Sequence, residues 1–317
     1  MFFFEIIDVT PLAETDSVYL STARKVVVSD SMIFFADWKS RLVYGMDRKG
    51  HLVHVYGSVG HAGNEYIEVR DLSLSSDGSC LEILDTEKLL RYDIASARFV
   101  SSLKIPANGI CSSLPADEKH HLLYAPHPTD GHSLMLMNDA DGSVSKLRDN
   151  PWFSLSVSSL VKGDERILIL PHYGEYTIDC YEDGALRHLF RLDLGDKVLP
   201  DGTRPQNYEQ FEEADKQVGL FRSVTGVAEN KTWLYAEIAG PGNNYYMAFV
   251  NKNNKRIVAG KVKKEFPIAI TGMNGNNVYG IFYPEYITDT VGVATSLKEY
   301  VNKNAQNPLL VTMRIAE

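Results

Sequence analysis

An aspartate-centred turn that returns about every 45 residues is the feature that most constrains how this chain folds. The turns read MDRKG at 46–50, YDIAS at 92–96, MNDADG at 137–142 and YEDG at 181–184. Their aspartates, Asp47, Asp93, Asp139 and Asp183, are 46, 46 and 44 residues apart, and a related turn, VNKNNK, follows at 250–255. A fixed period of this length is typical of repeat folds, in which each unit packs against its neighbours.

Short alternating or β-branched runs on both sides of each turn predict strands. The first unit has its runs at 26–28, 32–36, 42–46 and 52–56, and the second at 71–74, 80–84, 89–93 and 99–104. The third, fourth and fifth units extend over about 110–147, 155–192 and 222–262. Four strands in each unit predict the blades of a β-propeller.

The sixth unit lacks one strand, because only 268–283 and 309–315 supply suitable runs. The apolar run at 2–7 belongs to no other unit, and we expect it to pair with 309–315 and close the ring. Closure of the ring removes exposed sheet edges. The sequence therefore predicts an all-β fold, a six-bladed β-propeller that forms a single domain over 1–317. Two short helical insertions are expected, at 207–217 and 294–303.

Charge and composition exclude several classes of protein. The chain has 32 Lys and Arg against 41 Asp and Glu, a net charge of −9, and binding to nucleic acid needs a cationic face. Cys80, Cys111 and Cys180 are far apart and form no zinc-binding motif, so we expect reduced, mostly buried thiols. We therefore expect neither nucleic acid as a partner nor disulfides that organise the fold.

The sequence offers no sign of a membrane segment or an export signal. No apolar run approaches the ~18 residues that a membrane-spanning helix needs. The first residues, MFFFEIIDV, contain Glu5 and Asp8 where a signal peptide has a basic start followed by a longer apolar stretch. We therefore expect no membrane span, and the sequence alone leaves the localisation open.

Two segments resemble a known family. Residues 30–66, DSMIFFADWKSRLVYGMDRKGHLVHVYGSVGHAGNEY, resemble the opening blade of the bacterial six-bladed β-propeller proteins related to NHL-repeat proteins. NPLLVTMRI at 307–315 resembles that family's last strand. The family's Gly-Arg-Gly-Pro-Gly-Glu-Tyr loop is replaced here by GHAGNEY at 60–66, which keeps only Glu65 and Tyr66 of its final part. The resemblance implies the propeller fold and a periplasmic or cell-envelope location.

Propeller geometry selects the candidate binding residues. The loops between the second and third strands of each blade, and the loops that lead to the next blade, emerge on one face, where ligands commonly bind. We expect a ligand over the channel mouth on that face, where several polar groups converge. The candidates are Asp37, Trp38, His61, Glu65, Asp85, His127, Trp152, His172, Tyr173, Asn244 and Tyr283.

Some of these candidates have a known chemistry. His127 and His172 each follow a proline at equivalent points of adjacent units, and imidazole can ligate a metal or transfer a proton. Trp38 and Trp152 offer flat aromatic faces on which a sugar ring can stack. A polar-loop or packing role is the alternative for each of them.

Two functions are compatible with this pattern. The first is a non-catalytic binding protein whose loops hold a small molecule, a glycan or a protein, with no cofactor. The second is a metal-dependent hydrolase or lyase whose metal lies near the channel mouth, held by some of His127, His172, Asp37 and Asp85. Propellers host both classes, so the fold does not choose between them. No catalytic residue is identified from the sequence.

Overall fold

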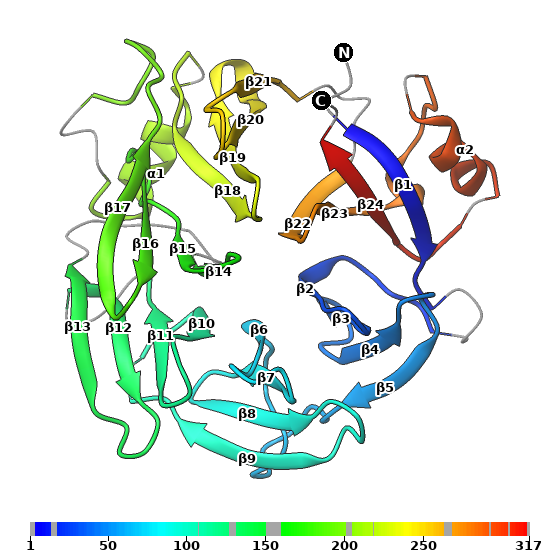
Figure 1. Cartoon of the computed structure of the whole chain (residues 1–317), viewed down its shortest axis with the longest axis vertical. Coiled ribbons are helices and arrows are strands. Elements are labelled where there is room, and N and C mark those ends of the chain that lie inside the picture. The colour runs from blue at the N-terminus through cyan, green and yellow to red at the C-terminus, as the bar shows by residue number, and fades with distance from the viewer. Residues whose placement is uncertain are drawn as a thin grey trace.

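Six four-stranded antiparallel sheets form a closed ring around a central channel (Figure 1). This arrangement, seen in a computed structural model, confirms the predicted six-bladed propeller. The structure describes residues 4–13, 18–106, 108–126, 131–149, 160–200, 205–217, 219–262, 268–291, 293–303 and 305–315.

The strands of each blade run from the channel to the rim in chain order for the first five blades. Blades 1 and 2 consist of β2 (Ala23–Val28), β3 (Met32–Asp37), β4 (Val43–Asp47) and β5 (Leu52–Tyr56), then β6 (Asp71–Leu74), β7 (Cys80–Leu84), β8 (Lys88–Asp93) and β9 (Phe99–Lys104). Blade 3 consists of β10 (Ser112–Pro115), β11 (His120–Tyr124), β12 (His132–Asn138) and β13 (Val144–Asp149). Blades 4 and 5 consist of β14 (Leu160–Lys162), β15 (Ile167–Ile169), β16 (Thr177–Glu182) and β17 (Ala185–Arg191), then β18 (Ser223–Glu229), β19 (Trp233–Gly240), β20 (Asn244–Asn251) and β21 (Ile257–Lys261).

Both ends of the chain build the sixth blade. From the channel outward its strands are β22 (Ile268–Asn274), β23 (Asn277–Phe282), β24 (Leu309–Ile315) and β1 (Phe4–Pro11). The register of β1 and β24 extends from Phe4 opposite Ile315 to Pro11 opposite Leu309, and Figure 1 shows β1 outside β24. The expected closure by the N-terminal strand is therefore confirmed; residues 2 and 3 lie outside the described part of the chain.

The two predicted helical insertions are present. Helix α1 (Tyr208–Asp215) follows blade 4, and its first turn is capped by Asn207, whose side-chain oxygen accepts a 2.9 Å hydrogen bond from Gln210 N. Helix α2 (Thr295–Asn302) lies between β23 and β24, and single turns of 3-10 helix occur at Pro241–Asn243 and Pro284–Tyr286. None of the helices in the described ranges is long and apolar enough to cross a membrane.

The apolar side chains lie mainly between neighbouring blades. Between blades 1 and 2, for example, Phe34, Tyr56, Leu72 and Tyr92 belong to one buried cluster, and the Tyr56 hydroxyl donates a 2.7 Å hydrogen bond to Ile94 O. Each blade thus covers the face of the next, which is how a propeller of this length forms without one large core.

The recurrent aspartates at the hairpin turns differ in what they bind. Asp47 Oδ1 accepts from Lys49 N and His51 N at 2.8 and 2.9 Å, and Asp93 Oδ1 accepts from Ser96 N at 2.8 Å. Asp183 and Gly184 both have positive φ, 52° and 75°, which suits a tight hairpin turn. Asp139 instead contacts side chains of blades 2 and 3. In that turn the side chains of Asn138 and Asp141 accept from Ala140 N and Ser143 N, so a turn forms at all four positions of the repeat.

Candidate functional site

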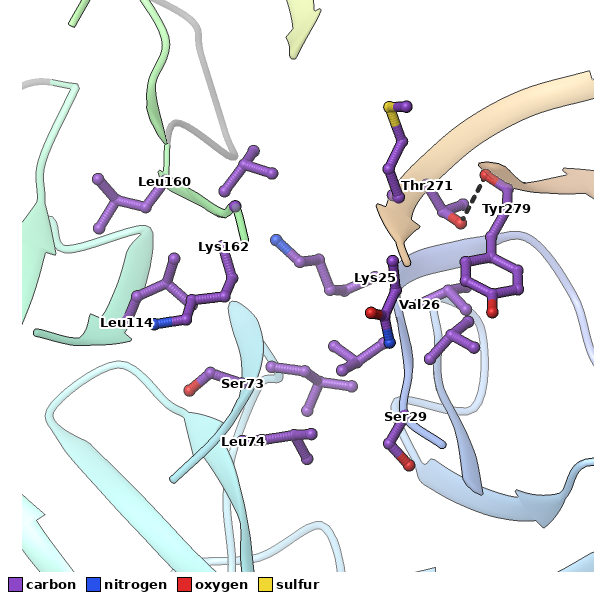
Figure 2. A pocket seen from close by; sticks show the side chains of 18 of the residues that line it. Lys25, Val26, Ser29, Ser73, Leu74, Leu114, Leu160, Lys162, Thr271 and Tyr279 are labelled. Carbon is purple, nitrogen blue, oxygen red and sulfur yellow. Dashed lines mark hydrogen bonds between the residues drawn. The ribbon is translucent and has the colours of Figure 1, made fainter. Parts of the chain in front are cut away.

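A cavity of about 740 Å³ occupies the central channel and is lined by the innermost strands of all six blades (Figure 2). Its lining extends from Ala23, Arg24 and Tyr283 at one end to Asp30, Asp77 and Asp164 at the other. Pockets of about 300–1,000 Å³ commonly hold small molecules. The channel is therefore large enough for such a ligand.

The end with Arg24 and Tyr283 opens on the face predicted to bind a ligand, which we call the loop face. Here the loops before the first strands contact the loops after the second strands, since Trp38 N donates to Thr22 O at 3.0 Å. The other end opens on the turn face, which carries the hairpin turns at Asp47 and Asp93.

Exposed aromatic side chains gather at the loop-face end of the channel. Trp38 is 62% exposed, Tyr286 is 60% exposed and Tyr19 is 46% exposed. We call these three residues and Tyr283 the aromatic mouth. Large aromatic side chains that remain exposed together are typical of binding surfaces.

Hydrogen bonds and a stacked guanidinium group hold the aromatic mouth in place. The Tyr19 hydroxyl donates to Glu285 Oε2 at 2.9 Å, and the Tyr286 hydroxyl lies 3.2 Å from Thr22 Oγ1. The Arg24 guanidinium lies 4.7 Å from the centre of the Trp38 ring. Three chain segments distant in the sequence are thereby fixed around the opening.

Tyr283 belongs to both the aromatic mouth and the lining of the cavity. Its hydroxyl accepts a 2.9 Å hydrogen bond from Ala23 N, and its ring centre lies 5.7 Å from that of Tyr286. Burial raises the pKa of Tyr283, so the phenol stays neutral. Of the candidate residues predicted from the sequence, Tyr283 and Trp38 lie at this opening in the described part of the chain.

Three acidic candidates accept hydrogen bonds from their own loop or from the loop that precedes their blade. Asp37 is buried and accepts hydrogen bonds from Ser21 Oγ at 2.7 Å and Ser40 N at 2.6 Å. Asp85 is buried and accepts from the backbone N–H groups of residues 67 and 68, at 3.2 and 3.1 Å. Glu65 accepts from Ala62 N at 3.0 Å and lies against Gly60, where a Cβ atom would clash with the carboxylate.

The remaining candidates are dispersed. His172 is buried, with Nδ1 3.3 Å from the Tyr124 hydroxyl and Nε2 3.3 Å from Ser133 Oγ. The buried Tyr173 ring lies 4.8 Å from that of Phe211, between the blade and helix α1. Asn244 Nδ2 donates to Pro241 O at 2.7 Å, and His61 is exposed on its loop. His127 and Trp152 lie outside the described residues.

The residues that the structure describes offer no metal site of the expected kind. No group of three or more His, Cys, Asp or Glu side chains within those ranges is placed to hold a metal ion. Asp37 and Asp85, two of the proposed ligands, already accept backbone N–H groups.

Two lysines that were not predicted as site residues line the channel. Figure 2 shows Lys25 on β2 and Lys162 on β14 within the cavity wall. Lys25 Nζ lies 3.1 Å from Asp71 Oδ1, and the other Asp71 oxygen accepts from Ser112 Oγ at 2.5 Å. These lysines could have been recognised in the sequence, because a lysine is unusual in an innermost strand and the other channel-lining strands are largely apolar.

A buried ionic cluster joins blades 2 and 3 and was also missed. His121 Nδ1 lies 2.7 Å from Asp139 Oδ1, and Arg91 donates to both Glu82 and Asp139 at 2.8 Å. Burial alone lowers the pKa of His121, but the hydrogen bonds and charges of Asp139 and Glu82 outweigh it and raise the pKa to about 9. The cluster is not among the residues that line the cavity, and its ion pairs connect blade 2 with blade 3.

A family model matches nearly the whole chain. Residues 2–313 match the model of the family described as Domain of unknown function (DUF4934), and the chain belongs to that family. No match was found among curated protein sequences. The expected relation to NHL-repeat proteins stays a prediction.

Solved structures similar to this chain are propellers. The "Putative exported protein (BF0058)" from Bacteroides fragilis NCTC 9343 has a TM-score of 0.83 at 13% identity, covering 99% of this chain and 96% of that one. A member of the duf4221 family from Bacteroides vulgatus ATCC 8482 has a TM-score of 0.64 at 9% identity, covering 99% and 98%. At these identities the likeness extends to the fold alone.

Proposed function

We propose that this protein is a non-catalytic binding protein that takes a small molecule into its central channel from the loop face. The observation that carries the proposal is the aromatic mouth, which opens on a cavity of about 740 Å³. Tyr283 connects the two, because it contacts Tyr286 and also lines the cavity.

The shape of the site favours a small molecule over a protein or a long glycan. A ligand that enters the channel is surrounded by six strands, whereas a macromolecule contacts only the rim. Trp38 and Tyr286 at the rim can stack on a flat or sugar-like part of the ligand. Asp37, Asp85, Glu65 and His172 support the loops around the mouth instead of contacting the ligand, because their polar atoms are already bonded.

The alternative, a metal-dependent hydrolase or lyase, has less support in the described residues. Its proposed ligands Asp37 and Asp85 are buried and hold backbone N–H groups. Metal analysis of the purified protein separates the two functions, since stoichiometric zinc or calcium favours the hydrolase or lyase.

A location outside the cytoplasm fits this proposal. The similar protein from Bacteroides fragilis carries the name "Putative exported protein", and we propose export for this chain as well. Fractionation of cells that express the full-length natural protein tests it.

Ligand screening by thermal shift tests the proposed function. The probes are sugars, amino acids and organic acids, and affinities for those that stabilise the protein are then measured by calorimetry. We expect Trp38→Ala and Tyr286→Ala to weaken binding by about 1 to 3 kcal/mol, since an aromatic contact is lost. Asp93→Ala, on the turn face, is the matched control and leaves the affinity unchanged. A loss confined to Asp93→Ala contradicts a site at the loop face.

A further inference from the structure

Among the residues that the structure describes, Lys162 is a channel-lining cation without a neutralising partner. Lys162 lines the cavity, and no ion pair or hydrogen bond joins its ammonium group to another residue in the described ranges. Lys25, on the same channel, is neutralised by Asp71 at 3.1 Å. The two lysines therefore differ in whether a charge is left for a ligand.

Asp30 and Asp164 also line the turn-face end of the cavity; both are exposed, and neither forms an ion pair with Lys162 in the described ranges. Two other acids near this end are held by their own partners. Glu229, which lies against Gly163, accepts from Lys252 Nζ at 2.7 Å and lies 3.3 Å from Arg166 Nε. Asp77 accepts from Ser75 Oγ at 2.6 Å and Ser79 N at 3.0 Å within its own turn. The side chain of Lys162 is exposed, and partial burial of its ammonium group lowers its pKa.

The position of Lys162 is apolar in blades 1, 2 and 3, whereas in blade 5 it is occupied by Glu229, which does not line the cavity. The residue after Lys162 begins a turn in which Gly163 N donates to Arg166 O. The matching turns of blades 1 and 2 are formed by Ser29 N, which donates to Met32 O, and by Ser75 N, which donates to Cys80 O. The equivalent residues in blades 1, 2 and 3 are Val28, Leu74 and Pro115, and all three line the cavity. Lys162 is thus a single positive charge at the level of an apolar collar.

We propose that the channel binds a small monocarboxylate with a hydrocarbon body, whose carboxylate pairs with Lys162. One ammonium group matches one negative charge, and the apolar collar contacts the hydrocarbon part. A phosphate group, with more charge and more acceptor oxygens, needs more donors than this level of the channel supplies. The inference rests on the proposed function, since it assigns the ligand class of the same cavity.

Calorimetric titration of the full-length protein with hexanoate, hexanamide and inorganic phosphate tests the assignment. Hexanamide has the same hydrocarbon body without the charge. We expect hexanoate to bind at least about 10-fold more tightly than hexanamide, and Lys162→Met to weaken hexanoate binding about 10-fold or more, because a charge-assisted hydrogen bond is lost. Lys162→Arg keeps the charge and restores most of the affinity.

Lys231→Met is the matched control, because Lys231 is an exposed cation in the corresponding turn of blade 5 and does not line the cavity. It leaves hexanoate binding unchanged. As a second measurement on the wild type, hexanoate slows acetylation of Lys162 and not of Lys231.

Three results overturn the assignment: no saturable binding of hexanoate, equal affinity for hexanoate and hexanamide, or equal affinity of Lys162→Met and wild type. Tighter binding of phosphate than of hexanoate overturns the monocarboxylate class. If neutral probes still bind and Trp38→Ala weakens their binding, the protein binds small molecules as proposed and the assignment of a carboxylate ligand is wrong. If Lys162→Met abolishes hexanoate binding and Trp38→Ala does not affect it, the entrance is wrong and the anion site stands.

Discussion

His121 Nε2 lies 3.0 Å from Glu82 Oε2, and this contact joins blade 3 to blade 2 at a point where neither side chain reaches solvent. Removal of His121 leaves the two carboxylates Glu82 and Asp139 with Arg91 as their remaining cationic partner, and the breaking of a buried ion pair costs about 3 to 5 kcal/mol. We therefore expect His121→Gln to lower the free energy of unfolding by about that amount near pH 6, as measured by urea denaturation. Asp117, on the exposed turn beside His120, supplies a control, since Asp117→Asn changes stability little.

The same contact predicts how stability depends on pH. Folding raises the pKa of His121 from 6.5 to about 9, so its contribution is complete below pH 6.5 and is lost as the pH rises through about 9. The pKa values of Glu82 and Asp139 are lowered, because His121 and Arg91 outweigh the effect of burial, and their contribution is lost in acid. The difference in unfolding free energy between wild type and His121→Gln should shrink from pH 6 to pH 9. A constant difference contradicts a charged His121.

Closure of the ring by β1 gives a further prediction. Because this strand joins the two ends of the chain in one blade, we also propose that residues 1–317 unfold as one unit. Ile6 packs against the core of blades 5 and 6, whereas the adjacent Ile7 is 43% exposed. We expect Ile6→Asp to destabilise the protein by about 1 to 3 kcal/mol and Ile7→Asp to have little effect. Deletion of residues 1–10 should lower Tm and promote aggregation, because it exposes the edge of β24. If the truncated protein has the same Tm as the full chain, β1 does not close the ring.

Thiol labelling provides a third prediction. The three cysteines, all within described segments, are free; Cys180 is buried, and Cys80 and Cys111 are half-buried. Burial raises the pKa of Cys111 to about 12 and also raises the pKa of Cys180, so the reactive thiolate is scarce at neutral pH. We expect slow modification of the native protein by a thiol reagent and fast modification in urea. Rapid native labelling of Cys111 or Cys180 contradicts this burial.

Asp85 provides a fourth prediction, because it separates support of a loop from contact with a ligand. Its carboxylate accepts two backbone N–H groups of the preceding loop. Asp85→Ala should lower the unfolding free energy by about 1 to 3 kcal/mol. The exposed Glu87, two residues later, is the control, and Glu87→Ala should be neutral. If Asp85→Ala leaves the unfolding free energy unchanged but changes the ligand affinity, Asp85 contacts the ligand and does not support the loop.

The sequence predicted the fold closely because strand alternation and turn-forming aspartates are local signals. Cys80–Leu84 and Phe99–Lys104 are strands with the predicted bounds, and the N-terminal strand was found from the missing strand of blade 6. The site was predicted less completely. An aspartate that follows a strand can face a ligand or hold backbone N–H groups, and the sequence of Asp37 and Asp85 is the same in either case.

The aromatic mouth escaped prediction for a different reason. The contact between Thr22 and Tyr286 joins residues 264 apart in the chain, so no local pattern announces it. Lys162 was passed over because loop residues were weighted above strand residues, although a lysine in a channel-lining strand was visible in the sequence.

A crystal structure of the protein with the tightest-binding small molecule from the screen shows whether the central channel is the binding site. We expect the ligand to lie inside the channel, between Tyr283 at the loop face and Lys162 toward the turn face. Soaking Trp38→Ala crystals under the same conditions should give lower occupancy. A ligand bound on the outer strands of the blades, or at the hairpin turns around Asp47 and Asp93 with an empty channel, contradicts a binding site in the channel.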